Sequence, residues 1–191
     1  NKTKIATLEI NPPNLTSDKI LIYVHGNSED IYTSCLGMEH IAMSLGIKVV
    51  TFDYVGYGLS TDDNNRIPSE EGCYKAINIV MEYYMSQYSK NKMYLVGISL
   101  GSGVVVEFVH KNHWTNPIML ISPYKSIGRI VYDASYIDKM FKHNMFSTYD
   151  KIHKITCPVK IIHGKDDTLI NVSHGYDIYN KLKNKSLKPE W

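Results

Sequence analysis

The feature that most constrains the fold of this chain is a serine between two glycines, at the junction of two apolar runs. The stretch reads Met93-Tyr94-Leu95-Val96-Gly97-Ile98-Ser99-Leu100-Gly101-Ser102-Gly103. Residues 97–101 fit Gly-x-Ser-x-Gly, a pattern in which a strand turns sharply into a helix and exposes the serine. The turn is so tight that a Cβ two residues before or after the serine would collide with the backbone. The pattern predicts Ser99 as a nucleophile, and a glycine-rich turn with a solvated serine is the alternative.

Apolar runs that favour strands alternate with helical patterns along the chain. We expect strands at 4–10, 20–24, 47–52, 93–98, 117–122 and 159–162, and helices at about 31–45, 69–88, after 99 and at 173–183. Near-continuous apolar runs such as 20–24 are typical of strands buried on both faces of a parallel sheet. The alternation predicts an α/β fold, with a mostly parallel sheet and helices on both faces. We expect one domain over residues 1–191, with a small cap or insertion at about 123–156.

Two residues typical of helix ends support these helix boundaries. Gly46 follows the 31–45 pattern at the position where a C′ glycine ends a helix. Ser69 precedes Glu70 and Glu71 and is placed as an N-cap, with the two carboxylates at the positive end of the helix dipole.

Polar residues follow several of the expected strands. In open α/β sheets, functional groups gather at the carboxyl ends of strands. A serine nucleophile needs a base, and the base needs an acid that fixes its tautomer. In this architecture the partners follow in the order serine, acid, histidine. Asp166 and Asp167 follow the 159–162 strand and are candidates for the acid, although adjacent aspartates are also ordinary turn formers.

Two backbone N–H groups must stabilise the oxyanion of the tetrahedral intermediate. The residue after the nucleophile, Leu100, supplies one of them. The loop after the first long buried strand supplies the other, which makes Asn27, after His25-Gly26, the candidate. His25-Gly26-Asn27 is also an ordinary turn, and the two interpretations coexist because the donor belongs to the backbone.

The general base has no clear candidate in this sequence. His174 is the only histidine after Asp167, and it lies near the start of the last expected helix. A base on a separate loop beyond another strand is the usual arrangement. We therefore expect His174 to cap or line that helix.

Composition and missing motifs exclude several other classes of function. The net charge is +2 with no basic stripe, so we expect no nucleic-acid partner. No apolar run approaches the roughly 18 residues that span a bilayer. Cys35, Cys73 and Cys157 lack CxxC spacing, which predicts free thiols in a reducing compartment and no zinc site. Phosphate-loop and dinucleotide fingerprints are incomplete, and we expect no cofactor and no metal.

Taken in order, these motifs resemble the α/β-hydrolase superfamily over nearly the whole chain. Within it the chain is similar to the small eukaryotic α/β-hydrolase-domain proteins that include protein depalmitoylases. The matching stretches are 25–27, 52–58, 97–101, 122–123, 155–167 and 173–175. The resemblance implies Ser99 as nucleophile, Asp167 as acid, and Asn27 and Leu100 as oxyanion donors. It selects Asp167 over Asp166 because the second aspartate matches the His-Gly-x-x-Asp spacing.

The resemblance also implies what the chain acts on. We expect a serine hydrolase that cleaves an ester or thioester through an acyl-enzyme, with a small-molecule ester or an acylated protein as substrate. An acyl-protein thioesterase is the specific expectation, and a serine peptidase or a non-catalytic binding protein on the same fold are the alternatives. The family implies a cytoplasmic place or one at the cytoplasmic membrane face, with peripheral membrane association of the full-length protein.

The family continues past the position of Trp191 into a last strand, a Gly-His segment with the catalytic histidine, and a last helix. We therefore expect the natural protein to extend further and these 191 residues alone to be nearly inactive. An edge strand lost beside 159–162 would leave an unpaired apolar edge.

Four large apolar residues within the expected insertion have two interpretations. They could line an acyl groove or pack the insertion on the core, and packing is the commoner use of such clusters. The four are Met140, Phe141, Met145 and Phe146.

Overall fold

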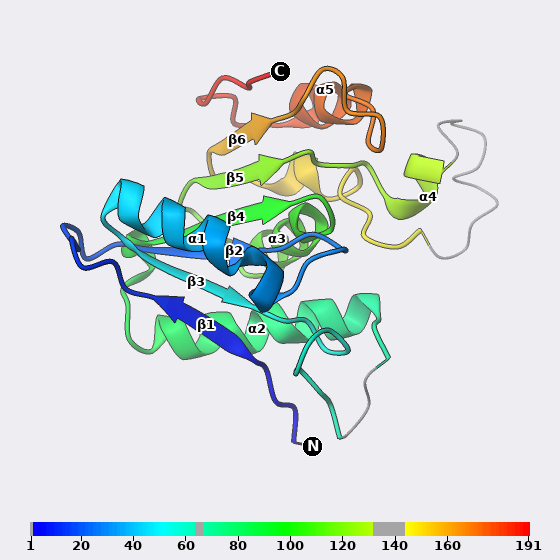
Figure 1. Cartoon of the computed structure of the whole chain (residues 1–191). Coiled ribbons are helices and arrows are strands. Elements are labelled where there is room, and N and C mark those ends of the chain that lie inside the picture. The colour runs from blue at the N-terminus through cyan, green and yellow to red at the C-terminus, as the bar shows by residue number, and fades with distance from the viewer. Residues whose placement is uncertain (1, 64–66, 132–143) are drawn as a thin grey trace. The chain divides into compact units, whose positions relative to one another are not determined.

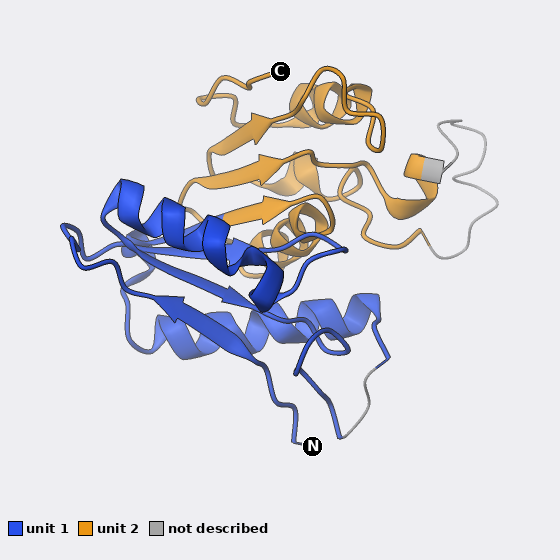
Figure 2. Cartoon of the chain, viewed as in Figure 1, with its two compact units in different colours: residues 1–95 blue, residues 96–191 orange. Residues whose placement is uncertain are grey.

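A computed structural model describes residues 2–63, 67–131 and 144–191 of the chain. The chain divides into two compact units, residues 1–95 and 96–191 (Figure 2). The expectation of one domain over residues 1–191 stays a prediction.

The first unit is a small sheet with a helix on each side (Figure 1). Its strands are β1 (Thr7–Ile10), β2 (Ile20–Val24) and β3 (Lys48–Phe52), in the order β1-β3-β2. β2 and β3 are parallel, and β1 is antiparallel to β3. The helices are α1 (Ile31–Leu45) and α2 (Glu70–Met85), followed by a 3-10 turn at Lys90–Lys92. Every residue of β2 is buried, as its continuous apolar run predicts.

Helix α1 begins and ends at residues that the sequence predicts. The Asp30 carboxylate accepts the Thr33 amide at 2.8 Å, and the Thr33 hydroxyl accepts the Asp30 amide at 2.9 Å, which completes a capping box. Gly46 ends the helix with φ 61° and ψ 34°, the left-handed conformation that favours glycine. The predicted range 31–45 is confirmed.

Helix α2 also starts where it was expected but ends earlier. The Ser69 hydroxyl accepts the Gly72 amide at 3.0 Å, so Ser69 is the N-cap. The helix ends at Met85 instead of Tyr88. The Ser86 hydroxyl donates to the Tyr83 carbonyl at 2.6 Å, a local bond that competes with helix continuation.

The second unit carries the serine turn and the strands that follow it. β4 (Met93–Ile98) crosses the boundary between the units and leads into α3 (Leu100–Lys111). β5 (Ile118–Ile121) and β6 (Val159–Ile162) are parallel, in the order β4-β5-β6. α4 (Ile127–Val131), a 3-10 turn at Ile152–Lys154 and α5 (Ser173–Lys181) complete the described elements. All residues from Leu100 to Val109 are buried, so α3 is a core helix.

The outer edge of β6 is partly paired, which corrects the expectation of an unpaired apolar edge beside residues 159–162. The His163 amide donates to the Glu190 carbonyl at 2.9 Å, and the Glu190 amide donates to the Ile161 carbonyl at 2.8 Å. These bonds form a parallel bridge between Ile162 and Glu190. The chain before Trp191 therefore covers part of the edge that we expected to be unpaired.

The region 123–156 is only partly described. Phe146 is buried, with its Cβ beside Gly103 of α3, so packing on the core holds for this residue. Met145 is 40% exposed. Met140 and Phe141 lie outside the described residues.

The described residues also bear on cysteines, metals and membranes. Cys35, Cys73 and Cys157 are free thiols, as their spacing predicts. In residues 2–63, 67–131 and 144–191, no cluster of three metal-ligating side chains occurs, and no helix has the length and apolarity that crossing a bilayer requires.

Gly46, which follows α1, and Gly37, within the helix, give a matched test of this local structure. A Cβ at Gly46 would lie 2.5 Å from the Thr16 hydroxyl oxygen, in a left-handed conformation, whereas a Cβ at Gly37 meets nothing within 4 Å. We expect Gly46→Ala to lower the free energy of unfolding by about 1–2 kcal/mol. Gly37→Ala should raise it by about 0.5–1 kcal/mol. Urea denaturation measures both, and equal signs for the two variants would contradict the cap.

Candidate active site

Ser99 stands at a strained turn between β4 and α3. Its backbone has φ 48° and ψ −118°, a conformation that residues other than glycine rarely adopt. Its amide donates to the Ile121 carbonyl at 2.9 Å. Its carbonyl accepts both the Ser102 amide at 2.9 Å and the Ser102 hydroxyl at 2.6 Å. The surrounding bonds thus hold Ser99 in a strained conformation, an arrangement that is concentrated at functional sites.

The close approach of strand and helix at this turn explains one of its glycines. A Cβ at Gly97 would lie 2.5 Å from the Gly101 carbonyl oxygen and 2.9 Å from the Ser102 Cα. Real Cβ atoms do not approach backbone this closely, so the position accepts only glycine without a backbone shift. The expected collision two residues before the serine is confirmed.

The carboxyl ends of β4, β5 and β6 meet at one edge of the sheet in the second unit. The Ser99 amide bonds to the end of β5, and the Ser122 amide bonds to the Ile162 carbonyl at the end of β6, at 2.8 Å. Ser122 also has a positive φ of 45°. Ser99 and the 163–167 loop therefore lie at the same edge, with the end of β5 between them.

Asp167 is held in place by hydrogen bonds from its own loop. Its Oδ1 accepts the Leu169 amide at 3.0 Å and the Ile170 amide at 2.9 Å, and its carboxylate also accepts the Ser122 hydroxyl. Asp166, in contrast, is exposed. The structure therefore separates the two aspartates and favours Asp167 as the fixed carboxylate.

These contacts also set the charge of Asp167. Burial acts to raise the pKa of its carboxyl, but the hydrogen bonds from Ile170, Leu169 and Ser122 and the nearby His163 outweigh it and lower the pKa below the ordinary value. Asp167 is consequently ionised at neutral pH. An ionised carboxylate in a fixed orientation is suited to orient a histidine base.

His163 is a buried residue beside the predicted acid, and no role was predicted for it from the sequence. Its side chain is fully buried, its Nε2 donates to the Ile170 carbonyl at 2.7 Å, and the same nitrogen lies 3.6 Å from the Asp167 Oδ2. His163 thus fastens the loop whose amides hold Asp167. The sequence feature that could have indicated this role is the position of His163 directly after a buried strand and before Gly164.

His174 has the role that the sequence predicts for it. It is 2% exposed at the first turn of α5, and its Nδ1 accepts the Lys125 amide at 3.1 Å. This bond connects α5 to the segment after β5. A ring nitrogen that is already bonded to a backbone amide is poorly placed to take a proton from a serine.

Asn27 lies in the first unit, in the turn after β2. We call residues 25–27 the oxyanion loop, after the predicted role of the Asn27 amide. His25 is fully buried, and its Nδ1 donates to the Gly26 carbonyl at 2.7 Å. Burial lowers the pKa of His25, although the hydrogen bond to Gly26 and the charge of Asp53 act to raise it, so the ring is neutral at neutral pH. Asn27 is exposed. Its pairing with Leu100 of the second unit stays a prediction.

Asp53 connects this loop to α1 within the first unit. Its Oδ1 accepts the Ile31 amide at 2.9 Å and lies 3.9 Å from the His25 Nε2. A Cβ at Gly58 would lie 2.0 Å from the Asp53 Oδ2, so the chain wraps closely around this carboxylate. Asp53 thereby fixes the start of α1 beside the buried His25 ring.

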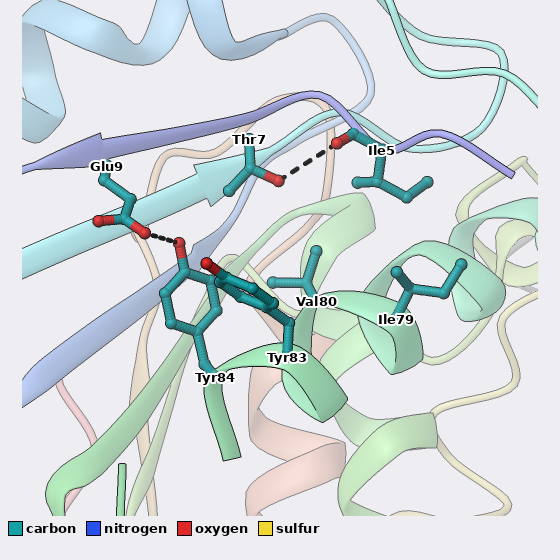
Figure 3. A pocket seen from close by; sticks show the side chains of 7 residues that line it. All are labelled: Ile5, Thr7, Glu9, Ile79, Val80, Tyr83 and Tyr84. Carbon is teal, nitrogen blue, oxygen red and sulfur yellow. Dashed lines mark hydrogen bonds between the residues drawn. The ribbon is translucent and has the colours of Figure 1, made fainter. Parts of the chain in front are cut away.

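Two cavities differ in their relation to these residues. One of about 540 Å³ lies in the second unit beside Asp167, and its lining includes residues 165–169, Ile130, Asn171 and His174. The other, of about 340 Å³, lies in the first unit between β1 and α2 (Figure 3). The Glu9 carboxylate in it already accepts the Tyr84 hydroxyl at 2.6 Å and pairs with Lys48 at 3.1 Å. Its lining contains none of the predicted catalytic residues, so we assign it no catalytic part.

The sequence matches a known family over most of its length. The family model described as serine aminopeptidase, S33, matches residues 16–149. A protein of Acanthamoeba polyphaga mimivirus described as an alpha/beta hydrolase, L404, is 40% identical over 194 residues, which cover all of this chain and 72% of that protein. The lysophosphatidylserine lipase ABHD12 of Danio rerio is 29% identical over 90% of this chain and 50% of its own length.

Solved structures agree with this match at the level of the fold. A soluble variant of monoglyceride lipase from Saccharomyces cerevisiae, in complex with a substrate analog, has a TM-score of 0.75 and 14% identity over all of this chain and 82% of that chain. The mostly parallel α/β-hydrolase fold that the sequence predicts is thereby confirmed. The chain spans 72% of the viral relative but only 50–55% of the animal relatives that it matches.

The strain at Ser99 gives a test that needs no activity. Ser99→Ala and Ser99→Gly both remove the hydroxyl, but only glycine accepts φ 48° and ψ −118° without cost. We expect Ser99→Gly to be more stable to unfolding than Ser99→Ala by about 1 kcal/mol, the strain released less the added entropy of the unfolded chain. Urea denaturation measures the difference, and a more stable alanine variant would show that the turn is unstrained.

The charge of Asp167 gives a test by pH. Because its folded-state pKa lies below the unfolded-state value, the carboxylate stabilises the fold above the unfolded-state pKa, and this contribution disappears as the pH falls through the folded-state pKa. We expect Asp167→Asn to lower the free energy of unfolding at pH 7, and the difference from wild type to shrink below about pH 5. The exposed Asp166→Asn is the matched control and should change little. A pH-independent difference for Asp167→Asn would contradict the assignment.

Proposed function

Because this chain belongs to the serine aminopeptidase S33 family of α/β hydrolases, we propose that it is a serine hydrolase that cleaves an ester or thioester with Ser99 as nucleophile. The observation that carries the proposal is the backbone of Ser99, held at φ 48° and ψ −118° between β4 and a buried helix. This turn lifts a serine out of the strand, as nucleophilic attack requires.

In the proposed reaction, the Ser99 Oγ attacks the carbonyl carbon of the substrate while a histidine base takes the hydroxyl proton. The carbonyl oxygen becomes an oxyanion that accepts hydrogen bonds from the Leu100 and Asn27 amides. The Leu100 amide belongs to the first turn of α3, where amides lack acceptors within the helix and the dipole favours negative charge. Each donor is worth roughly 3–4 kcal/mol in the transition state.

The intermediate then collapses, and the carbon–oxygen or carbon–sulfur bond to the leaving group breaks. The leaving group takes the proton from the histidine, and an acyl group remains on Ser99. Water, deprotonated by the same base, attacks this acyl-enzyme and releases a carboxylic acid and free serine. Asp167 would orient the base, and His174 fits the part of the base poorly because its Nδ1 already accepts the Lys125 amide.

The relatives bear on the class of substrate. The zebrafish relative is described as a lysophosphatidylserine lipase, and the yeast structural neighbour as a monoglyceride lipase. Similar proteins therefore include lipases. We propose acyl esters or thioesters, including those of acylated proteins, at the cytoplasmic face of a membrane. The aminopeptidase description of the family favours aminoacyl substrates as the second candidate. Turnover of acyl thioesters against aminoacyl amides separates the two.

A fluorophosphonate probe tests the nucleophile directly. Such probes phosphorylate activated serines, so we expect labelling of the full-length protein that is lost in Ser99→Ala and in heat-denatured wild type. Asp167→Asn should slow labelling strongly, since loss of the acid of a triad costs roughly 10³–10⁴-fold in rate. Asp166→Asn is the control and should stay within about two-fold of wild type, as an exposed carboxylate with no catalytic part. Equal labelling of wild type and Ser99→Ala would overturn the proposal and favour a non-catalytic binding protein.

A further inference from the structure

The oxyanion loop is tied to a second turn of the same unit by a side-chain hydrogen bond. The Tyr57 hydroxyl donates to the Asn27 Oδ1 at 2.6 Å, across 30 positions of sequence. We infer that Tyr57 is a positioning residue for the oxyanion loop, which holds the Asn27 amide where the developing oxyanion requires it. The inference rests on the proposed function, because it assigns a purpose to the Asn27 amide.

Two consecutive turns place Tyr57 at this point. The Tyr57 amide donates to the Tyr54 carbonyl at 2.9 Å, and Gly56 between them has φ 92°, the geometry of a type II turn. A Cβ at Gly56 would lie 2.5 Å from the Pro68 nitrogen, so glycine is required there twice over. The next turn starts at Tyr57 itself, whose carbonyl accepts the Ser60 amide at 2.9 Å. Tyr57 is therefore the rigid corner between two turns.

The rings of this segment pack around the same loop. The Tyr57 ring lies 5.7 Å from the His25 ring, centroid to centroid, and 5.3 Å from the Tyr54 ring, edge to face. The Tyr54 ring lies 4.3 Å from His25, and its hydroxyl donates to the His25 carbonyl at 2.5 Å. Tyr54 thus holds the backbone at the start of the loop, and Tyr57 holds the side chain at its end.

The burial of the two tyrosines gives them different tasks. Tyr54 is fully buried and belongs to the core, so its loss would disturb the fold. Tyr57 is only half-buried, and Asn27 is exposed. An exposed loop residue samples several conformations unless a bond restrains it, and an oxyanion donor is effective only when it is fixed before the reaction. The hydroxyl of Tyr57 supplies that restraint where core packing does not reach.

The simplest alternative is that Tyr57 contributes only its ring to packing. Tyr57→Phe keeps the ring and removes the hydroxyl, so it separates the two roles. Asn27→Ala keeps the backbone amide and removes the acceptor. If the bond acts through the loop, the two variants should have the same effect and the double variant should be no worse than either. Tyr32→Phe on α1, where Tyr32 is 83% exposed, is the matched control.

The kinetic experiment uses hydrolysis of a p-nitrophenyl acyl ester by the full-length protein. We expect Tyr57→Phe and Asn27→Ala each to lower kcat about five-fold, with KM within about two-fold, because the restraint matters for the transition state and not for substrate binding. Tyr32→Phe should match wild type. An unchanged kcat in Tyr57→Phe, a change in KM alone, or additive losses in the double variant would overturn the inference, provided that Ser99→Ala abolishes turnover.

A second measurement does not depend on turnover. The ¹⁵N relaxation order parameter of the Asn27 backbone amide should fall in Tyr57→Phe and in Asn27→Ala, and stay unchanged in Tyr32→Phe. If Ser99→Ala leaves hydrolysis intact, the proposed function fails while the order parameter still tests the tether. An order parameter that is unaffected by Tyr57→Phe would overturn the positioning role whatever the activity.

Discussion

The second unit depends on one close contact, the approach of β4 to the first turn of α3. A Cβ at Gly97 would lie 2.5 Å from the Gly101 carbonyl oxygen, so strand and helix meet with no side chain between them. This contact leaves Ser99 no unstrained conformation, and the bonds of its amide to Ile121 and of its carbonyl to Ser102 hold it there. The strain is therefore a consequence of packing, offset by a helix whose residues from Leu100 to Val109 are all buried.

From this turn the candidate site extends sideways along strand ends. The Ser99 amide bonds to the last residue of β5, and the Ser122 amide bonds to the last residue of β6. Both serines have a positive φ, 48° and 45°, so the chain leaves each strand through a residue whose backbone conformation is rare for residues other than glycine. The Ser122 hydroxyl donates to the Asp167 carboxylate. The end of β5 therefore helps to position the predicted acid. Parallel strands make this possible because their carboxyl ends share one edge.

The sequence predicts elements well where local rules decide, and poorly where distant segments decide. Helix α1 follows its expected range because the Asp30–Thr33 capping box fixes its start and Gly46 dictates a left-handed end. The early end of α2 is accompanied by a hydrogen bond from the Ser86 hydroxyl to the Tyr83 carbonyl. The sequence pattern does not predict this bond. The roles of Tyr57 and His163 were missed because they depend on contacts with Asn27 and Ile170. Those contacts are formed by the three-dimensional course of the turns, which the residue types alone do not predict. The choice of Asp167 over Asp166 came from the spacing of the family motif. The structure supplies a physical reason, because two loop amides donate to the Asp167 carboxylate. No such bond to Asp166 occurs among the described contacts.

Two strand ends with the same dipeptide show how this fold uses buried histidines. His25-Gly26 follows β2, and His163-Gly164 follows β6. Each ring is buried, each donates one N–H to a backbone carbonyl, and each lies within 4 Å of a carboxylate oxygen, at 3.9 Å for Asp53 and 3.6 Å for Asp167. The N–H that each ring donates binds a backbone carbonyl of its own loop, so each histidine helps to fix the loop that follows its strand. His25 thereby fixes the loop that carries Asn27, and His163 fixes the loop that carries Asp167, the residues that we propose as oxyanion donor and acid.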